Sequence, residues 1–479
     1  MSAIITENFR RNNTRLFLND ISTPTNGKYY LGIGKQDRWD DDEENITFTP
    51  PVAVGTQADA MEVLNNLSTL VSLNALTGVG RVIPAVAWKN GNTYQSYSSY
   101  NSNCFYPSGI LQPCYVTING AIFLCLRTGL NTSGVAKPST VAPSVQSSKY
   151  APFTLNDDGA GSGYIWVLVQ EAPTAQIIRN NTFTDISTTK LTGTEETNST
   201  TQCGGLVTGF TVVDGGTGYT TTGATPSVLK LRVNDGFIST DRSTTSVTLN
   251  FTVGTGGVIE TVSFPAGWPA YSGSNAAIGA LFASIEFTGS GSNAKIVPTI
   301  APAKGFAYDP SAIMPSWFAG LAISLDDSIS GDNFYSRYRQ ISIVKNPTVQ
   351  SGQENAGTLN TLKYINFPNT TDLSSLSVDI NSSDLKNITG EVIGYADKLI
   401  TTTGAKKLYF HQNLSSGYRE LPQSGNIKVG SNSTEYAYTS INNGEFINDG
   451  KAEVLFTENR SFITRASGQT EDLILIIQF

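Results

Sequence analysis

Apolar runs along the chain predict strands far more often than helices. Two apolar runs flank Asn119-Gly120 in YVTINGAIFLCL (115–126), and this dipeptide readily takes the positive-φ geometry of a tight hairpin. The stretches YYLGIG (29–34), GYIWVLVQ (163–170) and QISIV (340–344) also predict strands. Because IWVLV is apolar on both faces, we expect its strand to lie between two layers.

Helical periodicity is confined to two segments. Apolar residues repeat at the spacing of one helical face in TQADAMEVLNNLSTLVSLNAL (56–76), which starts with a capping-box-like Thr56 and Asp59 and is followed by Gly78. A second helix is predicted from about Thr6 to Leu18, with Phe9, Leu16 and Phe17 on one side. The sequence therefore predicts a mainly β protein with few helices.

The closing run LILIIQF (473–479) is apolar at most positions. Because both of its faces are apolar, we expect residues 472–478 to form an interior strand that pairs with a strand from far earlier in the chain. The acidic, turn-rich GQTED before it acts as a gatekeeper against aggregation.

The chain length and a local change of amino-acid composition indicate a main body with an inserted module. The chain has 479 residues, more than the usual single domain of about 250–300 residues. Charge thins out between about 202 and 304, where Gly, Ser and Thr dominate. We therefore predict an inserted β module at 202–304 within a body formed by residues 1–201 and 305–479.

The predicted module contains a weak internal repeat. GGLVTGFTVVDGGTGY (204–219) aligns with GGVIETVSFPAGWPAY (256–271) at a spacing of 52 residues. Two strand-turn-strand units explain this pattern, with glycines at the turns and the closing tyrosine of each copy packed between layers.

Charge and composition exclude several partners. The formal charge is −8 and the pI is about 4.9, which argues against a nucleic-acid partner because phosphate binding needs a concentrated basic face. The N-terminus has neither the order of a signal peptide nor the length of a membrane span, so we expect no membrane partner. The four cysteines, Cys104, Cys114, Cys125 and Cys203, form no C-x-x-C pair and are expected as reduced thiols in or near strands. A disulfide is the alternative, and the sequence does not choose among its pairings.

Motifs for catalysis are scarce. The single histidine, His411, follows an aromatic-aliphatic run and is interpreted as a strand-end residue without a catalytic role. The acidic segment DRWDDDEEN (37–45) favours a solvated or salt-bridging loop, because consecutive acids point in different directions. A weak divalent-cation candidate remains there in Asp40, Asp41, Asp42 and Glu43. We otherwise expect no enzyme activity and no cofactor.

Five blocks, in order, resemble the peripheral, dimer-forming baseplate wedge subunit of T-even-type contractile-tailed bacteriophages. They are IITENFRRNNTRLFLNDI leading to YYLGIGKQDRWDDDEENITFTPP, then RVIPAVAWKNGNTY, GYIWVLVQE, YRQISIVKNP and TENRSFITRASGQTEDLILIIQF. The positions that carry the resemblance are Trp39, Pro50, Pro51, Pro84, Trp88, Tyr164, Trp166, Arg339, Gln340, Asn346, Pro347, Glu458, Asn459, Arg460, Gln469, Glu471 and Phe479. The module at 202–304 is not part of this pattern and is similar to Gly-rich repeats of tail and fibre proteins of marine and cyanobacterial phages.

The resemblance implies a layered β-sandwich body with a few helices on connecting loops and no catalysis. It further implies a homodimer that contacts other wedge subunits in the tail baseplate of the virion, after assembly in the host cytoplasm. Such a subunit holds its neighbours and takes part in the baseplate rearrangement that precedes sheath contraction.

A rival function remains open. The 202–304 module carries Tyr219, Trp268 and Tyr271, whose aromatic faces could stack on sugars and make the chain a tail-associated glycan-binding protein. Glycan hydrolysis is a weaker form of this hypothesis, because the required carboxylate pair is defined in space and the 39 acidic residues single out no two.

Overall fold

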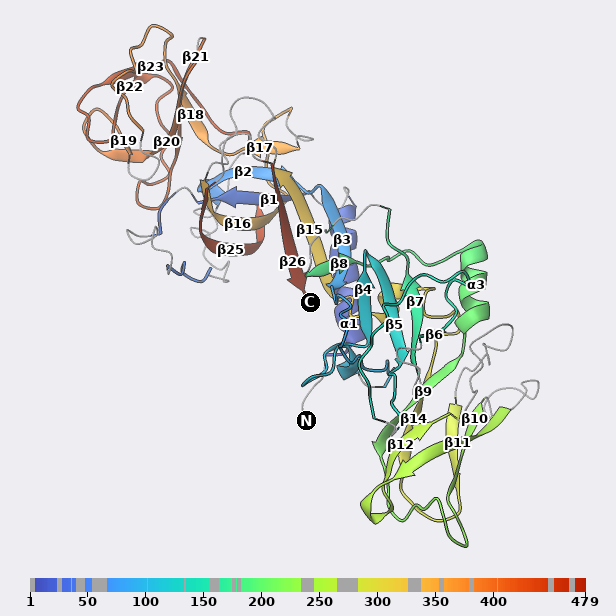
Figure 1. Ribbon diagram of the computed structural model, residues 1–479. Helices are drawn as coiled ribbons and strands as arrows, with labels where there is room; N and C mark the ends of the chain where they lie inside the picture. The colour runs from blue at the N-terminus through green and yellow to red at the C-terminus, as the bar shows by residue number, and fades with distance from the viewer. Residues whose placement is uncertain are drawn as a thin grey trace. The chain divides into compact units, whose positions relative to one another are not determined.

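The computed structural model (Figure 1) describes residues 5–23, 28–35, 37–39, 48–53, 67–100, 102–132, 135–155, 163–174, 178, 182–233, 245–264, 283–325, 337–352, 357–378, 383–402, 404–446, 452–464 and 470–479. Strands account for 44% of the described residues and helices for 10%, and the strands form multiple antiparallel sheets. The prediction of a mainly β protein is confirmed.

The chain divides into two compact units. Unit 1 comprises Met1–Arg15, Gly80–Gly320 and Ile477–Phe479, and unit 2 comprises Leu16–Val79 and Leu321–Ile476. The predicted module at 202–304 lies within unit 1, whereas the predicted body includes residues of both units. Whether residues 202–304 fold as a separate domain stays a prediction.

Unit 1 is built on the sheet β4-β5-β7-β6, formed by β4 (Tyr115–Ile118), β5 (Ala121–Arg127), β7 (Tyr164–Gln170) and β6 (Phe153–Leu155). Asn119 and Gly120 have φ of 51° and 87°, which confirms the predicted hairpin between β4 and β5. Every residue of β7 is buried. Alternate residues of β5 and β7 pack into two different clusters, one with Leu124 and Val167 and the other with Phe123 and Trp166. The two-sided burial expected for IWVLV is therefore confirmed.

Unit 1 also contains short helical elements and a short strand. They are the 3-10 helix η1 (Ser102–Phe105), α3 (Gly193–Cys203), α4 (Pro310–Ile313) and β8 (Phe183–Asp185). The four cysteines are buried and unbonded, as expected: Cys104 lies in η1, Cys114 precedes β4, Cys125 lies in β5 and Cys203 ends α3.

The Gly-rich segment of unit 1 forms two sheets, of order β12-β11-β10-β13 and β14-β9. Their strands are β9 (Val207–Asp214), β10 (Val228–Val233), β11 (Thr245–Val253), β12 (Ile259–Ser263), β13 (Ala283–Thr288) and β14 (Lys295–Ile300), with the 3-10 turn η2 (Thr255–Gly257) before β12. Val207 and Ile259, which begin β9 and β12, occupy equivalent positions of the predicted repeat. Tyr219 packs in the shared core with Leu229 and Leu231.

Unit 2 contains a five-stranded and a seven-stranded sheet. The first has the order β17-β2-β1-β16-β25 and the second the order β23-β22-β19-β20-β21-β18-β24. The five-stranded sheet consists of β1 (Tyr29–Gly34), β2 (Leu70–Ala75), β16 (Arg337–Lys345), β17 (Thr358–Asn360) and β25 (Glu453–Thr464). The seven-stranded sheet consists of β18 (Lys363–Asn366), β19 (Asp384–Lys386), β20 (Val392–Thr402), β21 (Ala405–His411), β22 (Gly425–Val429), β23 (Tyr436–Tyr438) and β24 (Ser440–Asn442). Each sheet has its own apolar cluster. Leu73 and Val344 belong to the cluster on the five-stranded sheet, and Leu408 and Phe410 belong to the cluster on the seven-stranded sheet.

The helix predicted at 56–76 is wrong over its last part. Leu70–Ala75 is the strand β2, paired on one side with β1 and on the other with β17. Its first five residues are buried, and pairing on both edges outweighs the helical spacing of the apolar residues. Residues 54–66 lie outside the described part of the chain.

The N-terminal helix is present as α1 (Glu7–Ser22) and ends four residues later than predicted. Its expected apolar face is not the buried one, because Phe9 and Leu16 are 55% and 51% exposed while Thr14 is fully buried. Polar contacts hold the helix instead: Asp20 pairs with Lys345 at 2.8 Å within unit 2.

The C-terminal strand pairs as expected but lies at an edge. A further sheet has the order β26-β15-β3-β8. In it β26 (Glu471–Gln478) adjoins β15 (Phe318–Leu325), which lies far earlier in the chain, and β3 (Gly78–Pro84) follows. The expectation of an interior strand is wrong, since only Leu475 of β26 is buried. An edge strand has one neighbour, which leaves its other side less covered.

Gly34 ends β1 where its register with β2 shifts. A Cβ atom there would lie 2.7 Å from the Leu70 Cα and 2.9 Å from the Thr69 carbonyl oxygen, both of which belong to the backbone. We predict that Gly34→Ala destabilises unit 2 by about 1–3 kcal/mol, the typical cost of overpacking, as measured by urea unfolding. Gly357→Ala is the matched control, because a Cβ there meets nothing within 4 Å. Equal effects of the two substitutions would contradict the prediction.

Candidate functional site

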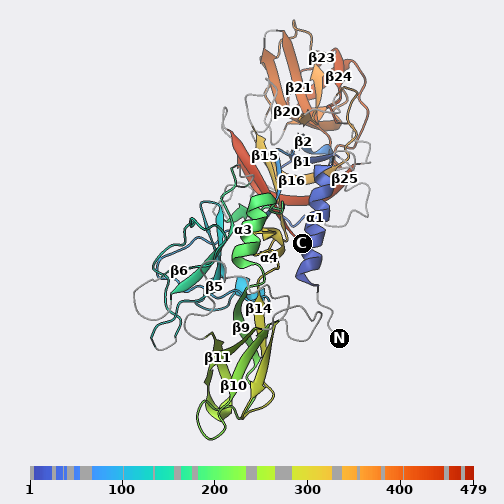
Figure 2. The same cartoon turned by 90° about the vertical axis from the view of Figure 1, so that its right-hand side faces the viewer.

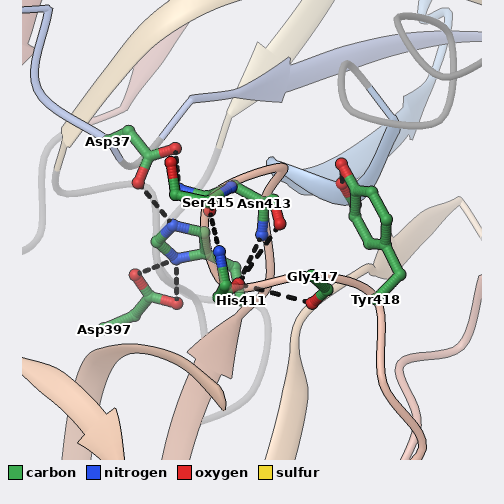
Figure 3. A network of polar contacts seen from close by, with 9 residues as sticks. Asp37, Asp397, His411, Asn413, Ser415, Gly417 and Tyr418 are labelled. Carbon is green, nitrogen blue, oxygen red and sulfur yellow. Dashed lines mark hydrogen bonds and ion pairs between the residues drawn. The ribbon is translucent and has the colours of Figure 1, made fainter. Parts of the chain in front are cut away.

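Three ionisable side chains of unit 2 meet in a buried cluster (Figure 3). The His411 Nδ1 lies 2.8 Å and 3.0 Å from the two carboxylate oxygens of Asp397, and its Nε2 lies 2.8 Å from the Asp37 Oδ1. The side chains of His411 and Asp397 are only 2% and 3% exposed, and that of Asp37 is 22% exposed. We call these residues the Asp-His-Asp cluster.

The hairpin of β20 and β21 supplies two members of the cluster. Tyr395 pairs with His411 and Ala396 with Phe410, but the next pair joins Lys398 to Tyr409. Asp397 is therefore an extra, bulged residue, and bulges re-aim side chains out of the regular alternation. The Tyr395 ring stacks on the imidazole at 5.6 Å between centroids and fixes its plane.

The third member comes from the segment that follows β1. Lys35 has a φ of 54°, so the chain turns sharply before Asp37. The Asn413 Nδ2 donates to the second oxygen of Asp37 at 3.0 Å. Asn413 is itself held by a local turn, in which its Oδ1 accepts from the amides of Ser415 and Ser416 at 2.9 Å and 3.0 Å.

Electrostatics favour a charged imidazolium. The two carboxylates outweigh the desolvation of His411 and raise its pKa to about 10. Desolvation also opposes ionisation of Asp37, but its contacts with His411 and Asn413 prevail and hold its pKa well below the usual range. Burial raises the pKa of Asp397, against the attraction of His411. The cluster is thus a cation clamped between two acids of different exposure.

The chemistry open to this cluster is restricted. In the imidazolium both ring nitrogens donate, one to each aspartate, so neither offers a lone pair to act as a general base. The ring is also closed to solvent. Among the described residues, no group of three or more His, Cys, Asp or Glu side chains is arranged to hold a metal ion. The arrangement fits a structural role, in which the cluster holds the segment after β1 against the hairpin of β20 and β21.

Trp39 provides a second contact between the segment after β1 and the rest of unit 2. Its Nε1 donates to the Arg460 carbonyl oxygen of β25 at 2.8 Å, and the Lys35 ammonium lies 4.4 Å from the centre of its ring. We name residues 35 and 37–39 the bracket segment. Within unit 2 it joins β21 of the seven-stranded sheet, through Asp37, to β25 of the five-stranded sheet, through Trp39.

Several residues that carry the phage resemblance contact one another on β25, beside the Arg460 carbonyl that accepts from Trp39. The Asn459 Oδ1 accepts from the Gln340 Nε2 at 2.8 Å, and its Nδ2 donates to the Pro51 carbonyl oxygen at 3.0 Å. Arg460 pairs with Glu458 at 3.0 Å. Residues from the first, fourth and fifth resemblance blocks therefore contact one another.

The other resemblance residues of unit 2 lie on or beside the same five-stranded sheet. Arg339 is 1% exposed and lies 5.7 Å from the Phe462 ring centre. Asn346, which precedes Pro347 at the end of β16, has a φ of 52° and its Oδ1 accepts from the Lys28 amide at 2.9 Å. Glu471 accepts from the Tyr338 hydroxyl at 3.1 Å. Pro50 lies in the described stretch 48–53.

In unit 1 the resemblance residues form local contacts of the core. Tyr164 and Trp166 are fully buried, and the Tyr164 hydroxyl donates to the Lys137 carbonyl oxygen at 2.6 Å. The Trp88 Nε1 donates to the Ser139 hydroxyl at 3.1 Å. The Pro84 carbonyl oxygen accepts from the Tyr115 hydroxyl at 2.7 Å, and the Phe479 amide donates to the Trp317 carbonyl oxygen at 3.0 Å.

Some predicted site residues cannot be compared. Asp40, Asp41, Asp42, Glu43 and Gln469 lie outside the described residues. Of the three aromatic residues suggested as a sugar platform, Trp268 and Tyr271 also lie outside them. Tyr219 is 5% exposed, so its ring faces the core of its sheets and not a ligand.

Sequence reasoning located His411 at a strand end but missed its partners. The sequence places Asp37 in an acidic run, and its pattern does not single out Asp397. A signal for Asp397 did exist: a carboxylate lies inside the strand sequence VIGYADKLITT, and a buried acid needs a partner. That the partner would be the single histidine depends on the β20 bulge, which the sequence does not announce.

Comparison with protein-family models gives no match, and no curated protein matches the chain significantly. Among the described residues, no helix is long and apolar enough to cross a membrane.

Replacement of His411 should destabilise unit 2, because it leaves the buried Asp397 without an opposite charge. We predict that His411→Phe, which keeps a ring to stack on Tyr395, lowers the free energy of unfolding of unit 2 by about 3–5 kcal/mol, as measured by urea unfolding. The control Arg419→Ala breaks the exposed pair with Glu391, whose side chains are 52% and 48% exposed, and should cost less than about 1 kcal/mol. A loss below that limit for His411→Phe would contradict the prediction.

The same cluster predicts how stability depends on pH. An unfolded histidine titrates near 6.5, whereas folding raises the His411 pKa to about 10. The stabilisation from His411 is therefore complete below pH of about 6.5, declines as pH rises from there to about 10, and is absent above. The raised pKa of Asp397 adds a decline in the same direction. Unfolding curves measured across this range should show the decline in the natural chain and a shallower one in His411→Phe.

Proposed function

We propose that this chain is a structural subunit of the baseplate wedge of a contractile phage tail, which acts as a homodimer that holds neighbouring wedge subunits. The observation that carries the proposal is the meeting of three resemblance blocks. Asn459 contacts Gln340 and Pro51 directly, and the adjacent Arg460 contacts Trp39. Residues that share a contact network are expected to match a family together.

The physical character of unit 2 supports this role. A wedge subunit transmits displacement from one neighbour to another, which requires bodies that move as rigid units while surface loops remake their contacts. The bracket segment ties two sheets with a buried ionic cluster on one side and an indole hydrogen bond on the other. Such cross-ties resist shear between sheets better than apolar packing alone, because they are directional.

The chemistry of the cluster also agrees with a role that is not catalytic. Its imidazole has both nitrogens engaged and is shielded from solvent. We therefore propose that the Asp-His-Asp cluster contributes stability and positioning to unit 2 and that the chain performs its work through contacts with other proteins.

Light scattering and reconstitution together test this proposal. The purified chain at micromolar concentration should have twice its 51.2 kDa mass and should co-purify with the wedge proteins encoded in the same phage genome. His411→Phe, by loosening the bracket segment, should reduce incorporation into wedges more than Arg419→Ala does. A monomer that binds none of those wedge proteins would contradict the proposal.

A further inference from the structure

Unit 1 contains an arginine-rich corner that plays no part in the function proposed above. Arg81 of β3 is 7% exposed, and its Nη2 donates to the backbone oxygen of Arg11 in α1 at 3.3 Å. The charged groups that act on it are Asp309, Arg11 and Arg15. Burial lowers the pKa of Arg81 and that of Arg11, because each guanidinium is desolvated.

The nearby acids are already engaged. Glu7 pairs with Arg11 at 3.0 Å. The Asp309 Oδ1 accepts from the Ser311 hydroxyl at 2.8 Å and from the Ala312 amide at 3.2 Å, which caps the start of α4. Its Oδ2 lies 3.8 Å from the Lys190 ammonium. Asp309 therefore acts on Arg81 through space and forms no hydrogen bond with it.

Arg11 is saturated by protein acceptors. Its Nε and Nη2 donate to the Met314 carbonyl oxygen at 3.2 Å and 3.1 Å, and its Nη1 donates to the Asn8 Oδ1 at 3.3 Å. These bonds join the N-terminal half of α1 to the end of α4 (Figure 2). The Arg11 guanidinium also lies 5.7 Å from the centre of the Trp317 ring.

Two donors beside Arg11 have no acceptor among the described residues. They are the Arg81 Nε and the Trp317 Nε1, both buried, on side chains that are 7% and 4% exposed. A buried donor without an acceptor lowers the stability of the fold by about 1–3 kcal/mol. A ligand rich in acceptor oxygens would satisfy the two donors of Arg81 and Trp317.

We infer that the corner formed by Arg81, Arg11 and Trp317 is a binding site for a small oxyanion. The ligand needs negative charge to offset Arg81 and Arg15 and at least two oxygen atoms to accept from separate donors. Phosphate, sulfate and carboxylate share this chemistry, and arginine recognises all three through its planar set of donors.

Calorimetric titration of the full chain tests the site, with sodium phosphate as the probe and chloride at matched ionic strength as the reference. Phosphate should bind saturably and raise the thermal midpoint, whereas chloride should not. Arg81→Gln should weaken phosphate binding at least ten-fold. Arg232→Gln, which removes an equal charge from the exposed Arg232–Glu286 pair of the same unit, should leave it unchanged. Parallel titrations with sulfate and acetate distinguish a tetrahedral from a planar ligand.

Trp317→Phe guards the test against misfolding of the Arg81 variant. It keeps an aromatic ring beneath Arg11 but removes the indole donor, so it should weaken phosphate binding several-fold while unit 1 stays folded. Equal phosphate binding by the natural chain, Arg81→Gln and Trp317→Phe would overturn the inference, as would the absence of saturable binding or an identical response to chloride.

Discussion

A single buried imidazolium, clamped between Asp37 and Asp397, holds unit 2 together at the point where its two sheets are joined. Each component would be unfavourable alone. A lone buried aspartate or histidinium loses its hydration without replacement. Together they replace water with three short contacts between opposite charges. The cost of burial makes the cluster cooperative, because removal of any one member leaves the others buried without an opposite charge.

The position of the bracket segment follows from this cluster. β1 lies inside the five-stranded sheet, and its last residue, Gly34, leaves no room for a side chain against β2. The chain then turns at Lys35 and delivers Asp37 to His411 and Trp39 to Arg460. This short stretch adds two polar links between the two sheets, which also share the apolar cluster of Val71, Leu362 and Tyr409. The proposed wedge role would use such links, because a subunit of a contracting assembly needs parts that move as rigid units.

The sequence predicted those parts of the fold that depend on local chemistry. The Asn119-Gly120 turn, the strands YYLGIG and GYIWVLVQ, and the N-terminal helix follow from turn residues and periodicity. It failed where tertiary pairing decides: Leu70–Ala75 has helical spacing but lies between two strands, and the closing apolar run lies at a sheet edge. The Asp-His-Asp cluster could not be predicted, because a one-residue bulge in β20 aims Asp397 at a histidine fourteen residues later.

The most direct measurement is the protonation state of the imidazole, which the composition of the chain makes unusually clean. His411 is the only histidine, so ¹⁵N spectra of histidine-labelled protein report on this ring alone. Both ring nitrogens should carry protons at pH of about 8, well above the 6.5 of an ordinary histidine, and should keep them until pH approaches about 10. A ring that titrates near 6.5, with a neutral imidazole at pH of about 8, would contradict the buried ionic clamp.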